Sequence, residues 1–486
     1  MKKSILFVLS LLLVTPLMKA ENIGVPAECE DVMLQGFYWD SYKTQSSTDS
    51  KYGRTKWIDL LKDTAAINAN FDLVWFPPSA SSTGGVGYYH ACLSNQDSDW
   101  GTKTKLTQLI AALHAGGTKV LGDIVINHRG NKSSWVDFWS DNFGSYGTFQ
   151  LKQEHICSGD EAFTSSDSPY KGSSTHGDAD TGTNDGGCRD LDHKSEYVQS
   201  WAKAYVQWMI NVMKYDGFRY DMTRGYHGRY LSMYNEAANP YFSVSEYWEG
   251  IDAQVSHLKA TNYNTLIFDF PLKYVLNNAL GKYSNYRLLN NPNNSLRNKG
   301  YKRYAVTFID NHDTFERSDN DGEFIKRNAD LSNADVKRRI MEANAYILLI
   351  PGVPCVFYPH WASYKDEINA LIAVRKRAGL HSESEISEVG DSQTNTYEAT
   401  VMGHRGTIVL RMGPNRSKEA PEGFEQVLDG GTAGEYTVFF QEGGQGVEEI
   451  ENGKWKMENG QKFLKDGQLM IKVGEKVYSI MGQRVD

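Results

Sequence analysis

Two patterns of apolar residues alternate along positions 30–378. Short apolar runs are typical of buried parallel strands, and longer segments repeat apolar residues every three or four positions, as on one helical face. Eight short runs predict strands, at residues 32–39, 73–76, 120–126, 217–221, 242–246, 266–270, 305–309 and 355–358. Strand and helix repeated eight times predict an α/β protein whose parallel strands close into a (β/α)8 TIM barrel.

The alternation is interrupted once, after the third predicted strand. Residues 129–197 are rich in Gly, Ser, Asp and Thr and show little helical periodicity. A stretch of this length inside a compact domain is usually a functional insertion. We therefore expect a loop-rich inserted domain at 129–197, with the barrel divided into residues 21–128 and 198–378.

The pattern changes again beyond Gly379. Short alternating runs at 397–402, 407–412 and 436–440 predict a C-terminal antiparallel β domain over residues 379–441. The chain then becomes polar and Gly-rich, and its final segment alternates like a hairpin. Residues 442–486 are interpreted as a linker followed by a tail.

The first twenty residues have the features of a secretory signal peptide. Lys2 and Lys3 precede an apolar run at 5–17, and Ala20 is a candidate cleavage site. We therefore expect a secreted protein, or one located in the periplasm or at the cell surface. No other segment has the apolar length needed to span a membrane.

Composition narrows the function classes. An apolar fraction of 40% permits a large core, and the net charge of −9 without a basic block argues against a nucleic-acid partner. Aromatic residues make up 12% of the chain and can stack on flat ligands such as sugars. The five cysteines show no zinc-binding spacing, and their pairing stays open. We expect a monomer.

Polar residues stand at the ends of four predicted strands, where barrel enzymes carry their active sites. They are Asp123, Asn127 and His128 after the third strand, Arg219 and Asp221 in the fourth, Glu246 after the fifth, and His312 and Asp313 after the seventh. One carboxylate at a strand end is usually a loop cap. Several in register indicate a catalytic site.

The three acids Asp221, Glu246 and Asp313 point to glycoside hydrolysis. Arg219 lies two residues before Asp221 and shares its face of the strand, so it can hold that carboxylate ionised. Desolvation and neighbouring carboxylates should raise the pKa of Glu246. Cleavage of a glycosidic bond requires one carboxyl group that is protonated and a second that is ionised.

These segments resemble the signature regions of the α-amylase family of glycoside hydrolases. Within it, residues 30–440 are similar to the plant and related bacterial α-amylases, and the likeness is carried by LQGFYWDS, YGRTKW, WGTK, DLDH, RGY, IDNHDT, PGVPCVFYPHW and ALIAVRKRAG. The resemblance implies endo-hydrolysis of α-1,4-glucosidic bonds in starch- or glycogen-type glucans, by double displacement with retention.

The resemblance also implies a role for each site residue. Asp221 matches the nucleophile, Glu246 the general acid/base and Asp313 the carboxylate that grips sugar hydroxyls. Substrate-binding positions are matched by Arg219, His128, His312, Tyr88 and Arg224. Retaining chemistry predicts a separation of about 5–5.5 Å between the Asp221 and Glu246 carboxyl groups.

A structural calcium ion is implied in the same way. Calcium prefers oxygen ligands from carboxylates, amides and backbone carbonyls. The family's ligands are matched by the side chains of Asn127, Asp180 and Asp190 and by backbone carbonyls near Cys188 and at Gly225. Such an ion would tie the insertion to the third and fourth strands.

Three features depart from patterns that are common in the family. His90 stands where the plant-like members usually carry a proline, in a loop that contacts substrate. Arg224 and Tyr226 replace a Lys-His pair found in many family members, as they do in the plant-like branch. The tail is not part of an amylase fold and resembles C-terminal sorting tails of secreted Bacteroidetes proteins.

Three alternatives remain at this stage. One is a maltooligosaccharide-forming amylase or a transglycosylase of the same family, which would share the three acids. Another is a non-catalytic α-glucan-binding protein, although such a protein would normally lose one of the acids. The third is a metal-dependent hydrolase, against which stands the lack of a His and carboxylate cluster with the spacing of an open metal site.

Overall fold

The computed structural model describes residues 22–43, 49–84, 86–160, 177–183, 188–281, 284–315, 333–431, 434–443, 461–465, 468–473 and 476–479. The predicted signal peptide lies outside these residues. Within them, no helix combines the length and the apolar character needed to cross a membrane.

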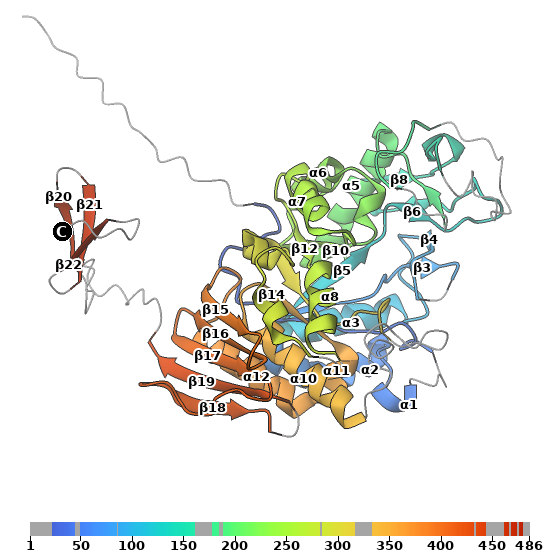
Figure 1. Ribbon diagram of the computed structural model, residues 1–486. Helices are drawn as coiled ribbons and strands as arrows, with labels where there is room; N and C mark the ends of the chain where they lie inside the picture. The colour runs from blue at the N-terminus through green and yellow to red at the C-terminus, as the bar shows by residue number, and fades with distance from the viewer. Residues whose placement is uncertain are drawn as a thin grey trace, which may run out of the picture.

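Eight parallel strands within the described ranges close into a barrel, in the order β1-β14-β13-β12-β11-β10-β5-β2 (Figure 1). They are β1 (Met33–Gln35), β2 (Leu73–Trp75), β5 (Lys119–Ile124), β10 (Gly217–Tyr220), β11 (Phe242–Ser245), β12 (Leu266–Phe268), β13 (Ala305–Thr307) and β14 (Val353–Phe357). Nearly all their residues are buried, as expected for strands covered on both faces. The predicted barrel is confirmed.

The largest difference in strand bounds is at β1, which ends at Gln35 although the apolar run continues to 39. Phe37 and Tyr38 are fully buried, but in a loop rather than in the ladder. Hydrophobic periodicity indicates which residues are buried, not which residues pair in a sheet. The predicted strand was therefore too long, because it included this buried loop. The loop carries Trp39 to the mouth of the barrel.

Helices form the outer layer of the barrel. They are α2 (Trp57–Asn70), α3 (Lys103–Ala115), α5 (Glu196–Asn211), α6 (Gly228–Ala238), α7 (Ile251–Ala260), α8 (Phe270–Ala279), α10 (Asn333–Leu349) and α12 (Lys365–Ala378), with short α1 (Asp49–Tyr52) and α11 (Tyr358–Ser363). Their ends follow local rules. Thr102 caps α3 by accepting from the Lys105 amide, and Gly379 ends α12 in a left-handed conformation with φ 66°.

In its described residues, the segment between β5 and α5 contains little regular structure, as predicted. It forms the short strands β6 (His128–Arg129), β7 (Asp141–Asn142), β8 (Thr148–Phe149) and β9 (Arg189–Asp190). The pairing of β6 with β9 brings the end of the insertion back to its start. A buried ion pair of 2.8 Å joins Arg129 to Asp141, whose Oδ2 also accepts from Trp201 Nε1 of α5. The insertion is therefore fixed to the barrel.

A further hairpin, β3 (Ser81–Ser82) with β4 (His90–Cys92), follows β2.

The predicted C-terminal β domain is confirmed as an antiparallel sheet in the order β15-β16-β17-β19-β18. Its strands are β15 (Glu385–Asp391), β16 (Thr396–Met402), β17 (Gly406–Met412), β18 (Glu425–Asp429) and β19 (Tyr436–Glu442). The sheet packs against α10 and α12 (Figure 1). In the tail, β20 (Gln461–Lys465), β21 (Gln468–Val473) and β22 (Lys476–Ser479) form a sheet of three strands, where the sequence had indicated a hairpin.

Candidate active site at the carboxyl ends of the strands

The strand register places Asp221 and Glu246 side by side. Tyr220 of β10 pairs with Ser245 of β11, and the two acids are the next residues on each strand. Arg219 pairs across the ladder with Asp123 of β5, so their side chains lie at the same level. Adjacent parallel strands thus deliver three carboxyl groups and one guanidinium to the same part of the barrel mouth.

Arg219 lies between these three carboxylates. Its Nη1 donates to Asp221 Oδ1 at 2.7 Å and to Asp123 Oδ1 at 2.9 Å, and its Nη2 is 2.8 Å from Glu246 Oε1. The sequence had predicted the contact with Asp221 alone. One cation facing three anions leaves an excess of negative charge in a place that is almost closed to solvent, since Arg219 is only 1% exposed.

The pKa values of the carboxyl groups reflect burial first and this excess of negative charge second. Burial raises the pKa of Glu246 to about 7, against the attraction of Arg219, and the repulsion of Asp221 adds to the rise. Burial likewise raises the pKa of Asp221 to about 7, again opposed by Arg219. Because both acids share one guanidinium, their titrations are linked. Such a pair can hold one proton near neutral pH.

The backbone also positions Glu246. The Met222 amide donates to Glu246 Oε2 at 2.9 Å, and Met222 adopts a left-handed conformation with φ 47°. Thr223 binds the Glu246 carbonyl through its amide at 3.1 Å and its hydroxyl at 2.8 Å. The turn after β10 therefore holds both the side chain and the main chain of Glu246, at the expense of local backbone strain.

The third acid, Asp313, lies in the turn after β13 and lines the same cavity as the other two. Asp313 Oδ2 is 3.3 Å from His312 Nε2, and His312 Nδ1 is 3.1 Å from Gln35 Nε2 at the end of β1. The side chain of Asn311 caps this turn by accepting from the Asp313 and Thr314 amides. His312 and Asp313 are thus fixed by neighbouring residues rather than by strand pairing.

Aromatic rings form one wall of the site. Tyr88 and His312 are nearly parallel, with centroids 5.2 Å apart, and Trp39 lies parallel to both at 6.2 and 6.0 Å. The Tyr88 hydroxyl donates to Asp123 at 3.0 Å, and the Tyr88 carbonyl lies 3.1 Å from His128 Nε2. Flat rings beside hydrogen-bonding groups suit a ligand with both faces and hydroxyls, such as a sugar.

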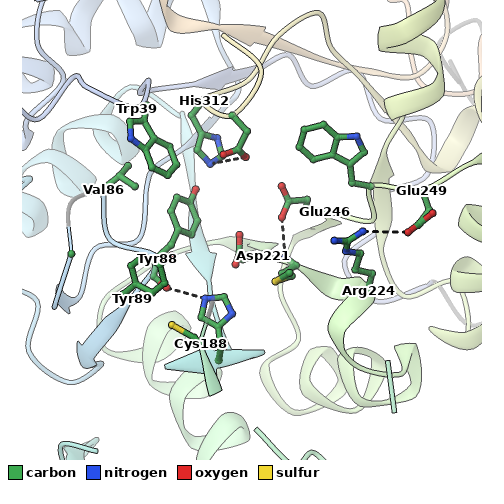
Figure 2. A pocket seen from close by; sticks show the side chains of 15 residues that line it. Trp39, Val86, Tyr88, Tyr89, Cys188, Asp221, Arg224, Glu246, Glu249 and His312 are labelled. Carbon is green, nitrogen blue, oxygen red and sulfur yellow. Dashed lines mark hydrogen bonds and ion pairs between the residues drawn. The ribbon is translucent and has the colours of Figure 1, made fainter. Parts of the chain in front are cut away.

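The acids open into a cavity of about 760 Å³ (Figure 2). Trp39, Tyr88 and Tyr89 line one side, and Arg224 and Glu249 lie on the other, with Asp221 and Glu246 between them. Arg224 forms a 3.4 Å ion pair with Glu249, and both are about one-third exposed. All three acids, together with His128, His312, Tyr88 and Arg224, contribute to this lining. Arg219 lies beneath it.

Comparison with known proteins identifies the family. Residues 55–392, more than half of the chain, match the family model described as Alpha amylase, catalytic domain. The chain belongs to the α-amylase family of glycoside hydrolases.

Relatives in plants are consistent with this membership. The chain is 30% identical over 412 residues to "Alpha-amylase 3, chloroplastic" of Arabidopsis thaliana, covering 81% of this chain and 42% of that protein. It is 29% identical over 410 residues to "Probable alpha-amylase 2" of the same plant, covering 79% of this chain and 88% of that protein. The fold matches an α-amylase from Geobacillus thermoleovorans, solved with acarbose, with a TM-score of 0.61, 16% identity and coverage of 85% and 98%.

Residues matched to the α-amylase calcium site come together beside β10. Asn127 Nδ2 donates to Asp190 Oδ1 at 2.7 Å, and a Cβ added to Gly225 would lie 2.0 Å from Asn127 Oδ1. Segment 177–183 packs on the same turn, because Thr183 N donates to the Arg224 carbonyl at 2.8 Å. Oxygen donors from three segments thus meet here, which fits a calcium ion.

Asp180 and Cys188 are placed less directly. The Asp180 carboxylate accepts from the amides of Thr181 at 2.5 Å and Gly182 at 3.1 Å, as in a local turn. The pKa of Cys157 is raised by burial first and then by the carboxylates of Asp180 and Asp190, which therefore lie near that thiol. Cys188 lines the catalytic cavity.

The sequence missed two contributors to the α-amylase site. Asp123 was noted at a strand end but given no role, yet it binds both Arg219 and Tyr88. Trp39 lay inside a family motif without an assigned function. The position of Asp123 near a strand end was the available signal, but its pairing with Arg219 depends on the register of β5 with β10. The parallel stack of Trp39 on His312 has no signal in the sequence.

The departure at His90 lies beneath the cleft rather than in it. His90 is fully buried in β4, and burial lowers its pKa well below the ordinary value, so the ring is neutral at physiological pH. Its neighbours Tyr88 and Tyr89 line the cavity.

Proposed function

We propose that this protein is an α-amylase that cleaves internal α-1,4-glucosidic bonds of starch- or glycogen-type glucans with retention of configuration. The observation that carries the proposal is the pairing of Asp221 and Glu246 around Arg219, at the base of a cleft with an aromatic wall. Family membership supplies the reaction class, and the site supplies the groups that this reaction needs.

In the proposed mechanism, Glu246 donates a proton to the glycosidic oxygen while an Asp221 carboxylate oxygen attacks the anomeric carbon. The C–O bond breaks as a covalent glycosyl ester forms on Asp221. Glu246, now ionised, removes a proton from water, which displaces Asp221 and releases the α-anomer. Retention follows from these two inversions, and a carboxyl separation of about 5–5.5 Å remains the prediction.

The surrounding residues are proposed to bind the sugar at the cleavage point. Asp313 accepts from its hydroxyls, His312 and His128 hydrogen-bond to them, and Tyr88 stacks on its face. Arg224 extends polar contact along the cleft from the wall opposite Tyr88. Arg219 favours the ionised form of Asp221 and aligns its carboxylate through the 2.7 Å bond.

We also propose that a structural calcium ion is held by Asn127, Asp180, Asp190 and the carbonyls near Cys188 and of Gly225. Calcium would supply a charge that cross-links the insertion to the turn after Asp221. Removal with a chelator should lower the melting temperature and the activity together, and calcium should restore both where magnesium does not. A melting temperature that chelation leaves unchanged would contradict this assignment.

Export is part of the proposal, on the basis of residues 1–20. The localisation is either extracellular, periplasmic or at the cell surface, and the C-terminal tail is the candidate sorting segment. Fractionation of cells that express the full chain and a variant ending at 443 would identify the compartment and the role of the tail.

The test of function compares starch hydrolysis by the wild type and Glu246→Gln. The amide keeps the shape of the side chain but cannot transfer a proton, so kcat should fall by about three or more orders of magnitude. Glu249→Gln is the matched control, since Glu249 lines the same cavity but lies outside the carboxylate cluster. It should retain activity within about tenfold.

Other outcomes of the hydrolysis test would contradict or refine the proposed function. Full activity of Glu246→Gln would remove that residue from the mechanism. A wild type that binds glucan but does not hydrolyse it would indicate a glucan-binding protein. Chromatography of products over time would separate an endo-acting amylase, which gives a falling range of lengths, from an enzyme that forms one oligosaccharide or transfers glucosyl units.

A further inference from the structure

Three side chains of the kinds that bind transition metals meet at the amino-terminal side of the barrel, away from the cleft. Glu28 precedes β1, His381 lies between α12 and β15, and His404 lies in the turn between β16 and β17. One ligand atom from each falls within 4.8 Å of the other two. His404 Nε2 is 3.6 Å from Glu28 Oε2.

A second carboxylate orients His404. Glu30 Oε1 lies 2.9 Å from His404 Nδ1, which leaves His404 Nε2 as the ring nitrogen that faces Glu28. Arg405 fixes Glu30 in turn, with Nη2 at 2.6 Å and Nη1 at 3.2 Å from its two oxygens. A histidine that donates its other N–H to a carboxylate is the usual outer-shell arrangement of a metal site.

The three segments are already tied together by backbone hydrogen bonds. The Ser382 amide donates to the Cys29 carbonyl at 2.9 Å, and the His404 amide donates to the Gly379 carbonyl at 3.0 Å. The Glu28 amide donates to Glu383 Oε2 at 2.9 Å, and Glu28 adopts a left-handed conformation with φ 45°. The ligand-bearing positions are therefore fixed by the fold rather than by chance meetings of surface side chains.

We propose that Glu28, His381 and His404 bind a zinc-type divalent transition-metal ion and thereby cross-link the segment before β1 to the C-terminal β domain. Two imidazoles and one carboxylate suit zinc, with water as the fourth ligand. Ligand atoms of a tetrahedral site lie about 3.3 Å apart, so the three ligand atoms, now within 4.8 Å of one another, must move closer together on binding.

One rearrangement accompanies binding. The His381 and His404 rings are stacked, with centroids 4.2 Å apart and planes inclined by 17°, and stacked rings cannot both point their nitrogen lone pairs at one ion. The His404 ring must tilt out of the stack, which its partial exposure to solvent of 35% permits. His381 is buried and stays in place.

Zinc titration of the untagged full chain, with calcium in excess, tests the proposal. Calorimetry should show one zinc site per chain and a rise in melting temperature with zinc, because a ligand that binds only the folded state stabilises it. His404→Ala should weaken zinc binding by at least about a hundredfold. Glu30→Gln should weaken it by about ten- to a hundredfold through the lost outer-shell contact.

His114→Ala is the matched control. His114 also pairs with one carboxylate, with Nε2 2.8 Å from Asp216 Oδ2, but among the described residues it belongs to no cluster of metal-binding side chains. This variant should bind zinc as the wild type does. Starch hydrolysis and circular dichroism report whether each variant is folded, and Glu28→Gln, at a largely exposed side chain, provides a second variant.

Two results would overturn the proposal. One is a zinc isotherm for folded His404→Ala and Glu28→Gln that equals the wild-type isotherm. The other is a wild-type protein whose melting temperature is the same with and without zinc.

Discussion

Two fully buried arginines lie in contrasting surroundings in this barrel. Arg219, at the carboxyl ends of the strands, contacts three carboxylates. Arg375, in α12, instead donates to three backbone carbonyls, those of Leu348, Ile350 and Gly352, at 2.9, 3.1 and 2.9 Å. Both side chains are removed from solvent, but Arg219 contacts carboxylates directly, whereas the hydrogen bonds of Arg375 go to backbone carbonyls.

The different surroundings of the two arginines indicate different roles, catalytic for Arg219 and structural for Arg375. Burial opposes the charge of Arg219, yet Asp123 and Glu246 raise its pKa above the ordinary value. Burial lowers the pKa of Arg375 to about 10, which still leaves it charged at neutral pH. Arg375 satisfies carbonyls at the end of α10, whereas Arg219 only partly neutralises its neighbours. The remaining negative charge at the mouth is what can hold or release a proton.

The largest expected effect comes from Arg219→Met. Loss of the guanidinium removes the group that aligns Asp221, so kcat should fall by at least about a thousandfold. It also leaves three buried carboxylates without their cation, which should lower the free energy of unfolding by about 3–5 kcal/mol near neutral pH. Steady-state kinetics and urea melts measure the two losses.

Arg219→Lys separates charge from geometry at the same position. Lysine keeps the charge but cannot bridge several carboxylates with a planar fork, so stability should recover more than activity. Equal recovery of both would mean that Arg219 acts as a charge alone. Arg219 would then differ from Arg375 in the charge that it contacts and not in the alignment of Asp221.

Arg375→Met should affect stability only. Three carbonyls lose their donor inside the protein, and we expect a loss of about 2–4 kcal/mol in the free energy of unfolding. The activity of each folded molecule should stay within about twofold, because Arg375 contacts nothing in the cleft. Urea melts and active-site-normalised rates give both quantities, and a large fall in kcat at constant folded fraction would contradict the comparison.

There is a physical reason why the sequence could predict which acidic residues gather at the carboxyl ends of the strands. A parallel barrel brings the carboxyl ends of all its strands to one face, so Asp221, Glu246 and Asp313 could be placed together from topology alone. The role of Asp123 depends on register, which is set by pairing between β5 and β10 and is not visible in either strand. The partners of Arg375 are backbone carbonyls, which leave no trace in side-chain identity.

Clusters formed by distant segments were equally hidden. More than 350 residues separate Glu28 from His381 and His404 along the chain. No motif spacing could therefore indicate that the three residues meet. The stack of Trp39 on His312 likewise joins the loop after β1 to the loop after β13. Such contacts follow from closure of the barrel and docking of the C-terminal sheet, which periodicity does not describe.

The smallest expected effect is a pH-dependent gain in stability from Glu246→Gln. Burial raises the pKa of Glu246 from 4.5 to about 7, so between these values the folded protein binds a proton that the unfolded chain does not. The contribution of this group to the free energy of unfolding is therefore greatest below pH 4.5 and is lost as pH rises toward 7. The neutral amide avoids that loss. The variant should match the wild type below pH 4.5 and exceed it by roughly 3 kcal/mol above pH 7. Urea melts across this range, with the partly exposed Glu249→Gln as control, measure the difference, and a gain independent of pH would show that the charge excess at Arg219 is not its cause.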